Sequence, residues 1–78
     1  MQTYISTNIK HLRTCRGITQ EQLSKACNKG YTAIGNWEKG IREPSANDLA
    51  NIANFFNISI DDLIKKDLRL NDSKENTN

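Results

Sequence analysis

The sequence predicts a compact all-α domain built from five helices. Its 78 residues make one small domain, and hydrophobic residues account for 36% of them, which suffices for a single core. Signals for helix starts and ends recur along the chain, while no stretch alternates between apolar and polar residues for long enough to form a strand.

The first helix is expected over residues 5–16. Ile5, Ile9 and Leu12 recur at helical spacing among polar neighbours. Gly17 follows them, and glycine is the residue that most often ends a helix in the left-handed conformation.

The second helix is expected over residues 19–27. Thr19 begins it, and Gln22 completes a capping box three residues later, in which each side chain bonds to the backbone N–H of the other residue. The residues expected on its inward face are Leu23, Ala26 and Cys27.

The third helix is expected over residues 31–38, after a break at 28–30. Ile34 and Trp37 are spaced to face the core, and Gly40 follows the helix end.

The last two helices each begin at a serine. Ser45 is paired with Asp48 and Ser59 with Asp62, both at the capping-box spacing, and Asn57 is suited to end the fourth helix. The apolar positions of these two helices are Leu49, Ile52, Ala53, Phe56, Leu63 and Ile64. The aromatic residues expected in the core are Tyr4, Trp37, Phe55 and Phe56.

This pattern places one domain at residues 1–66 and predicts a polar, disordered tail at 67–78. Such a tail also suits a linker, so the chain could be the N-terminal piece of a longer protein with a further domain. Four apolar residues near the boundary exceed what a small core needs. They would either cover a dimer interface or cap the core, and they are Ile60, Ile64, Leu68 and Leu70.

Charge and composition exclude several classes of function. Residues 1–66 carry nine Lys and Arg against six Asp and Glu, a net of +3, and residues 67–78 carry two against three. A mildly basic body permits a polyanion ligand without requiring one. One histidine and the lack of a glycine-rich phosphate loop argue against an enzyme and against a cofactor. No apolar run approaches 18 residues, and two cysteines are too few for a secreted disulfide scaffold, which favours the cytoplasm.

The second and third helices are spaced as a helix-turn-helix. Only a few residues join them, the small Ser24 falls where the helices would cross, and Asn28 tolerates the positive φ that the turn needs. A helix pair without any ligand is the alternative.

The outward face of the third helix carries Tyr31, Thr32, Gly35 and Asn36. These residues are uncharged, whereas a solvated face more often carries Lys and Glu. Asn36 could pair with both N6 and N7 of adenine, and the Thr32 methyl could meet a thymine methyl. A glycine inside a helix costs about 1 kcal/mol relative to alanine. Gly35 therefore indicates either the close approach of another backbone or a DNA groove, or simple tolerance in a well-packed helix.

These features together resemble the Cro/repressor-type helix-turn-helix family, also called the XRE or lambda-repressor-like group. The resemblance covers residues 5–66. The matching residues are Leu12-Arg13, Gly17-Ile18-Thr19-Gln20-Glu21-Gln22-Leu23, Ile34, Trp37-Glu38-Lys39-Gly40, Pro44-Ser45, Leu49, Ile52-Ala53 and Leu63.

The resemblance implies a lambda-repressor-like domain that binds a near-palindromic, double-stranded DNA operator as a homodimer and acts as a transcriptional repressor. The side chains implied to reach bases are Tyr31, Thr32 and Asn36, with Gly35 on the same face. The side chains implied to meet phosphate are Gln20, Lys39 and Arg42, and Gln20 is also implied to brace Tyr31. Arg13 and Glu38 match a buried ion pair that ties the first helix to the third.

Three turn residues depart from the family pattern. Asn28 replaces the usual glycine, Lys29 replaces a buried Val or Ile, and Gly30 replaces a Ser or Thr cap. The last change costs a few tenths of a kcal/mol. The three departures together bear on the position of the third helix and not on its existence.

Other functions were weighed against DNA binding. His11 and Cys15 share a helix face as metal ligands can, but a full set of four ligands is missing, so no metal is expected. The runner-up function is an antitoxin-like or other protein-interaction module with secondary DNA binding.

Overall fold

The computed structural model describes residues 3–70 and confirms the all-α fold of five helices. The helices are α1 (Ile5–Cys15), α2 (Gln20–Ala26), α3 (Ala33–Lys39), α4 (Ala46–Phe56) and α5 (Ile60–Lys65). A short helical turn at residues 68–70 follows α5, and no strand occurs within residues 3–70. None of the helices in this range is long and apolar enough to cross a membrane.

The capping boxes that the sequence indicated for α2 and α4 are confirmed, whereas at the start of α5 only the Ser59 hydroxyl accepts from the Asp62 N–H. The Thr19 hydroxyl accepts from the Gln22 backbone N–H at 3.0 Å, and the Gln22 side chain accepts from the Thr19 N–H at 2.8 Å. Ser45 and Asp48 form the same reciprocal pair at the start of α4. These bonds satisfy backbone donors that would otherwise lack partners at a helix start.

The helix ends also follow the sequence. Asn28 and Asn57 both adopt the left-handed conformation, each with a φ of 59°. Asparagine is the non-glycine residue best suited to this conformation, so Asn28 serves in the turn where the family usually has glycine.

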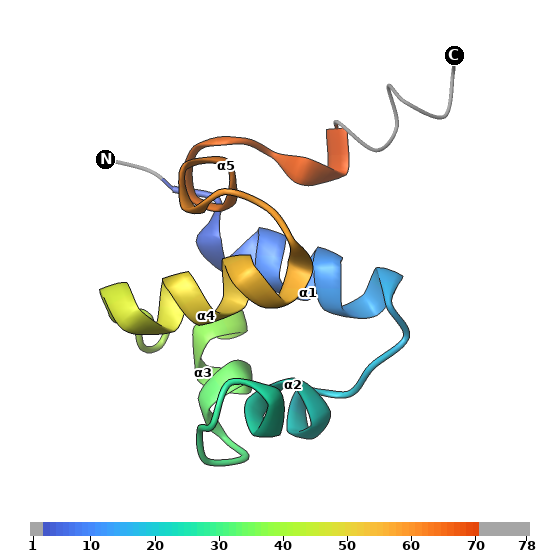
Figure 1. The fold of residues 1–78 in the computed structure, drawn as a ribbon, viewed down its shortest axis with the longest axis vertical. Helices are drawn as coiled ribbons and strands as arrows, with labels where there is room; N and C mark the ends of the chain where they lie inside the picture. Colours follow the sequence, from blue (N-terminus) through green and yellow to red (C-terminus); the bar gives the residue numbers. More distant parts are fainter. Residues whose placement is uncertain (1–2, 71–78) are drawn as a thin grey trace.

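The helix-turn-helix and α5 lie at opposite ends of the domain. The α2 and α3 helices pack against each other at one end of the domain, whereas α5 lies at the other end (Figure 1). The α1 helix packs against both α3 and α5, so it connects the two ends.

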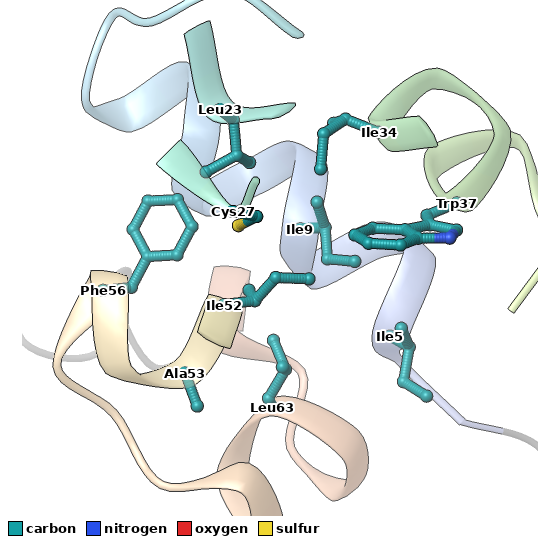
Figure 2. Close-up of a cluster of buried hydrophobic side chains, with 10 residues drawn as sticks. All are labelled: Ile5, Ile9, Leu23, Cys27, Ile34, Trp37, Ile52, Ala53, Phe56 and Leu63. Atoms are coloured by element: carbon teal, nitrogen blue, oxygen red, sulfur yellow. The ribbon is translucent and has the colours of Figure 1, made fainter. Parts of the chain in front are cut away.

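The core draws side chains from all five helices (Figure 2). Ile9, Leu23, Ile34, Ile52 and Leu63 are fully buried within it. Their burial holds α3 against α1 and fixes the surface that α3 presents to solvent.

Two core predictions were wrong. Ala26 is exposed, because the inward face of α2 is centred on Leu23, Ser24 and Cys27 and leaves Ala26 beyond its edge. Tyr4 is 41% exposed, because it precedes the first turn of α1 instead of lying on its inward face.

The folded body continues past the expected boundary at residue 66. Leu68 is buried, and its backbone N–H donates to Asn8 Oδ1 at 3.1 Å. The Nδ2 group of Asn8 donates to the carbonyl oxygens of Leu63 at 2.8 Å and Lys66 at 2.6 Å. This one side chain therefore fastens the end of α5 and residues 67–70 to α1. The expected disorder of residues 71–78 lies outside the described residues.

Candidate nucleic-acid interface

The turn between α2 and α3 is closed by backbone hydrogen bonds. The Lys29 N–H donates to the Ser24 carbonyl oxygen at 2.8 Å, which satisfies one of the last carbonyls of α2. Ser24 is fully buried in α2, and its small side chain allows the two helices to approach closely. The helix-turn-helix geometry is thus built from local bonds and one close crossing.

The third helix begins two residues later than the sequence predicted. It spans Ala33–Lys39, and Tyr31 and Thr32 lie in the turn before it. The Ala33 N–H donates to the carbonyl oxygen of Gly30. Thr32 is the N-cap residue, but its side chain makes no capping hydrogen bond. Because the chain has no serine or threonine at position 30, no side chain caps an earlier start.

The two turn residues remain accessible to a ligand. Tyr31 is 75% exposed, and Thr32 is exposed beside it. They precede the first turn of α3, at the end from which helix-turn-helix proteins read bases.

A groove of about 600 Å³ runs between α3 and the start of α4. It brings together three of the predicted contact residues, Thr32, Asn36 and Arg42. Lys39 is exposed at the last residue of α3, and it does not line this groove. The structure thus brings Thr32, Asn36 and Arg42 together beside α3.

Lys29 is a groove residue for which the sequence analysis had no role. Its Nζ lies 3.5 Å from Asp48 Oδ1 and 6.0 Å from the centre of the Trp37 ring. Burial pushes the pKa of Asp48 up, but the hydrogen bonds from Ser45 and the nearby Lys29 ammonium outweigh it, so this pKa lies below its usual value. The ionised Asp48 therefore tethers the turn to α4, where the family usually has an apolar contact.

Gly35 is half-buried and lies against the Gln20 side chain of α2. A methyl group added at Gly35 would lie 3.2 Å from Gln20 Oε1, closer than ordinary van der Waals contact. The group that approaches this glycine in the structure is therefore a glutamine side chain of the neighbouring helix.

Gln20 is held by a partner other than the expected one. Its Nε2 donates to Glu38 Oε1 at 2.9 Å, and it makes no hydrogen bond to Tyr31. The bond reaches the last turn of α3, so Gln20 braces the end of that helix and not its start.

Arg13 and Glu38 are brought together as a bidentate pair. Arg13 Nε donates to Glu38 Oε2 at 2.6 Å and Nη2 donates to Oε1 at 3.1 Å, while Nη1 donates to the Ile18 carbonyl oxygen at 2.9 Å. The side chains are only 13% and 4% exposed. The pair joins α1 to α3 as the resemblance implied.

The sequence analysis missed Asn8, although a signal was present. Asn8 lies on the apolar stripe of α1, next to Ile9 and one turn after Ile5. A polar side chain on an inward stripe must find hydrogen-bond partners when buried, so the pattern alone could have marked it as a structural bridge.

The histidine and the cysteines do not assemble a metal centre. Cys15 Sγ lies 3.7 Å from His11 Nε2, but no group of three potential ligands occurs among residues 3–70. Cys27 is buried in the core, where burial and the charge of Asp48 raise the pKa of its thiol. Both thiols are free.

The fold and this surface define a helix-turn-helix domain. The chain matches the helix-turn-helix family over residues 9–63 and belongs to it. The resemblance to Cro/repressor-type proteins is thereby confirmed.

Two characterised relatives share part of the sequence. The chain is 39% identical over 56 residues to the HTH-type transcriptional activator BcrR of Enterococcus faecalis, covering 72% of this chain and 28% of that protein. It is 30% identical over 63 residues to the HTH-type transcriptional regulator ImmR of Bacillus subtilis, covering 81% and 50%. The chain thus spans half or less of the length of these relatives.

Solved structures share the fold. The P22 c2 repressor protein, in complex with synthetic operator 9T, superposes with a TM-score of 0.76 at 28% identity, covering 81% of this chain and 96% of that one. A transcriptional regulator from Listeria innocua superposes with a TM-score of 0.78 at 22% identity, covering 99% and 78%.

Proposed function

We propose that the protein is a sequence-specific DNA-binding transcriptional regulator that places α3 in the major groove of double-stranded DNA. The observation that carries this proposal is the groove beside α3, where Thr32 and Asn36 lie next to Arg42. Uncharged side chains with donors and acceptors suit base edges, and a guanidinium suits the phosphates beside them. The P22 c2 repressor, which shares the fold, was solved in complex with an operator.

We further propose that the protein binds a near-palindromic operator as a homodimer and acts as a repressor. Tyr4, Ile60 and Leu70 are 41%, 41% and 61% exposed, and they supply apolar surface outside the α2–α3 face. A second copy would bury this surface, and a bound dimer excludes other proteins from the DNA that it covers. In this arrangement, the α3 helices of the two copies would read half-sites about 34 Å apart.

Selection of bound sequences from random duplexes, followed by footprinting, tests both proposals. We expect an enriched site with two related halves about one helical turn apart. A single asymmetric half-site bound by a monomer would contradict the dimer alone. Failure to enrich any sequence would contradict DNA reading and would favour the protein-interaction alternative.

Lys39 and Arg42 are expected to position the protein without reading sequence. Replacing either with alanine should weaken binding to every duplex alike and reduce the slope of log K against log salt by about one. The matched control is Lys65→Ala, which removes the same charge from α5 at the other end of the domain (Figure 1). An unchanged slope for both the Lys39 and the Arg42 variants would remove these residues from the interface.

Asn36 is expected to read a base. Asn36→Ala should cost about 1–3 kcal/mol on the selected site, much less on random DNA, and should relax the preference at one base pair. Titrations at one fixed salt concentration measure the difference. If specific and random binding fell equally with a changed salt slope, Asn36 would be a backbone contact instead.

A further inference from the structure

We propose that Glu38 is a positioning residue for DNA binding, because it fixes the orientation of the Gln20 amide, which the family resemblance implies to meet phosphate. This inference rests on the proposed function and extends it to a residue that itself makes no contact with DNA. The Glu38 side chain is 4% exposed, so it acts through Gln20.

The chemistry of a carboxylate decides which way the amide faces. An ionised Glu38 offers only acceptor oxygens, so the Nε2 group of Gln20 must face it and Oε1 must face away. The 2.9 Å bond from Gln20 Nε2 to Glu38 Oε1 has this polarity. Arg13 keeps the carboxylate in place through its own two bonds to Glu38.

Gly35 provides the space for the other half of the amide. Gln20 Oε1 lies beside the Gly35 backbone, at 3.2 Å from the position of a potential methyl group. The amide is therefore held between a carboxylate and a glycine. Its second N–H makes no hydrogen bond within residues 3–70, and we infer that this N–H is the donor to a phosphate oxygen.

A neutral substitution should invert this arrangement. In Glu38→Gln, the new side chain has one oxygen, which the Arg13 guanidinium would take, and one NH₂ group. That NH₂ group would face Gln20, so the Gln20 amide would turn its oxygen toward position 38. The donor offered to phosphate would then be displaced.

A double-mutant cycle on the selected duplex tests this action through Gln20. We expect Glu38→Gln to weaken binding on the order of fivefold in the parent chain and less than twofold in a Gln20→Ala background. Both backgrounds carry the same change in net charge, so the cycle is its own electrostatic control. Equal losses in the two backgrounds would show a general structural effect and overturn the proposal.

Gly35→Ala provides a second variant, which leaves the Arg13–Glu38 pair in place. The added methyl should displace the Gln20 amide, and the better helix propensity of alanine offsets part of the cost of this close contact, so the melting temperature is measured alongside binding. Binding should weaken in the parent and not in the Gln20→Ala background. A loss that persists in that background would mean that position 35 meets DNA directly.

The side-chain amide resonances of the free protein separate this inference from the proposed function. Glu38→Gln should shift the Gln20 NH₂ signals and leave those of Gln22 in place, because Gln22 uses its oxygen to cap α2. Unmoved Gln20 signals would overturn the inference whether or not DNA binds. A parent chain that selects no duplex, with the Gln20 signals shifted as expected, would instead contradict the function.

Discussion

Glu38→Ala should lower the free energy of unfolding by about 3–5 kcal/mol. The change removes the acceptor of two Arg13 bonds and leaves a guanidinium that is only 13% exposed without its counter-ion. A chain of this size has a total stability of roughly 4–12 kcal/mol, so the variant should lose a large fraction of it. Thermal and denaturant unfolding followed by circular dichroism measure the loss.

The loss of stability in Glu38→Ala should come from leaving the Arg13 charge buried without a counter-ion, and not from the absence of an ion pair as such. Replacing both partners with apolar residues of similar size, as in Arg13→Met with Glu38→Leu, should recover most of the stability. The matched control is Asp61→Ala, which breaks an exposed ion pair with Lys65 and should cost well under 1 kcal/mol. If Glu38→Ala melted within a degree or two of the parent, the pair would contribute nothing.

The helix boundaries that the sequence predicted well are those with a local chemical signal. Thr19 and Ser45 carry a hydroxyl at a helix start with a partner three residues later, and each capping box forms as expected. Asn28 and Asn57 were likewise recognisable as turn residues because few other side chains tolerate a positive φ. Such signals involve only four or five neighbouring residues, so they can be recognised in the sequence without knowledge of the tertiary structure.

The boundary at the start of α3 was missed because no such signal exists there. Gly30 offers no capping side chain, and Thr32 occupies the N-cap without a capping bond. The order at residues 67–70 was missed for a different reason. It depends on Asn8, about 60 residues away in sequence, which binds the Leu68 N–H.

Three residues that line the groove beside α3 were predictable from the sequence, but the contacts among the neighbouring side chains were not. The outward positions Thr32 and Asn36 and the cation Arg42 do meet in one groove. The Gln20 bond to Glu38 was not foreseen, because the relative position of α2 and α3 decides which side chains can reach each other. The resemblance supplied the pair of Arg13 and Glu38, and the structure adds Gln20 as its third member.

Asn8→Ala should also be strongly destabilising, by roughly 3 kcal/mol or more. The side chain is fully buried and makes three hydrogen bonds, to the carbonyl oxygens of Leu63 and Lys66 and from the N–H of Leu68. Removing it leaves three backbone groups without partners, at about 1–3 kcal/mol for each one that stays buried. The better helix propensity of alanine offsets at most about 0.7 kcal/mol of this cost, so the variant should be less stable than the parent.

The amides that lose protection from exchange should distinguish the local effect of Asn8→Ala from a general weakening of the core. Backbone hydrogen exchange should accelerate at Leu68 well before it does at Ile34, because Asn8 holds the C-terminal segment and not the helix-turn-helix. Asn51→Ala, on the exposed face of α4, is the matched control and should be neutral or slightly stabilising. Since Leu70 and Tyr4 lie near this clamp in the chain and belong to the proposed dimer surface, Asn8→Ala should also weaken self-association. Unchanged stability together with unchanged exchange at Leu68 would show that water replaces the side chain and that Asn8 is dispensable.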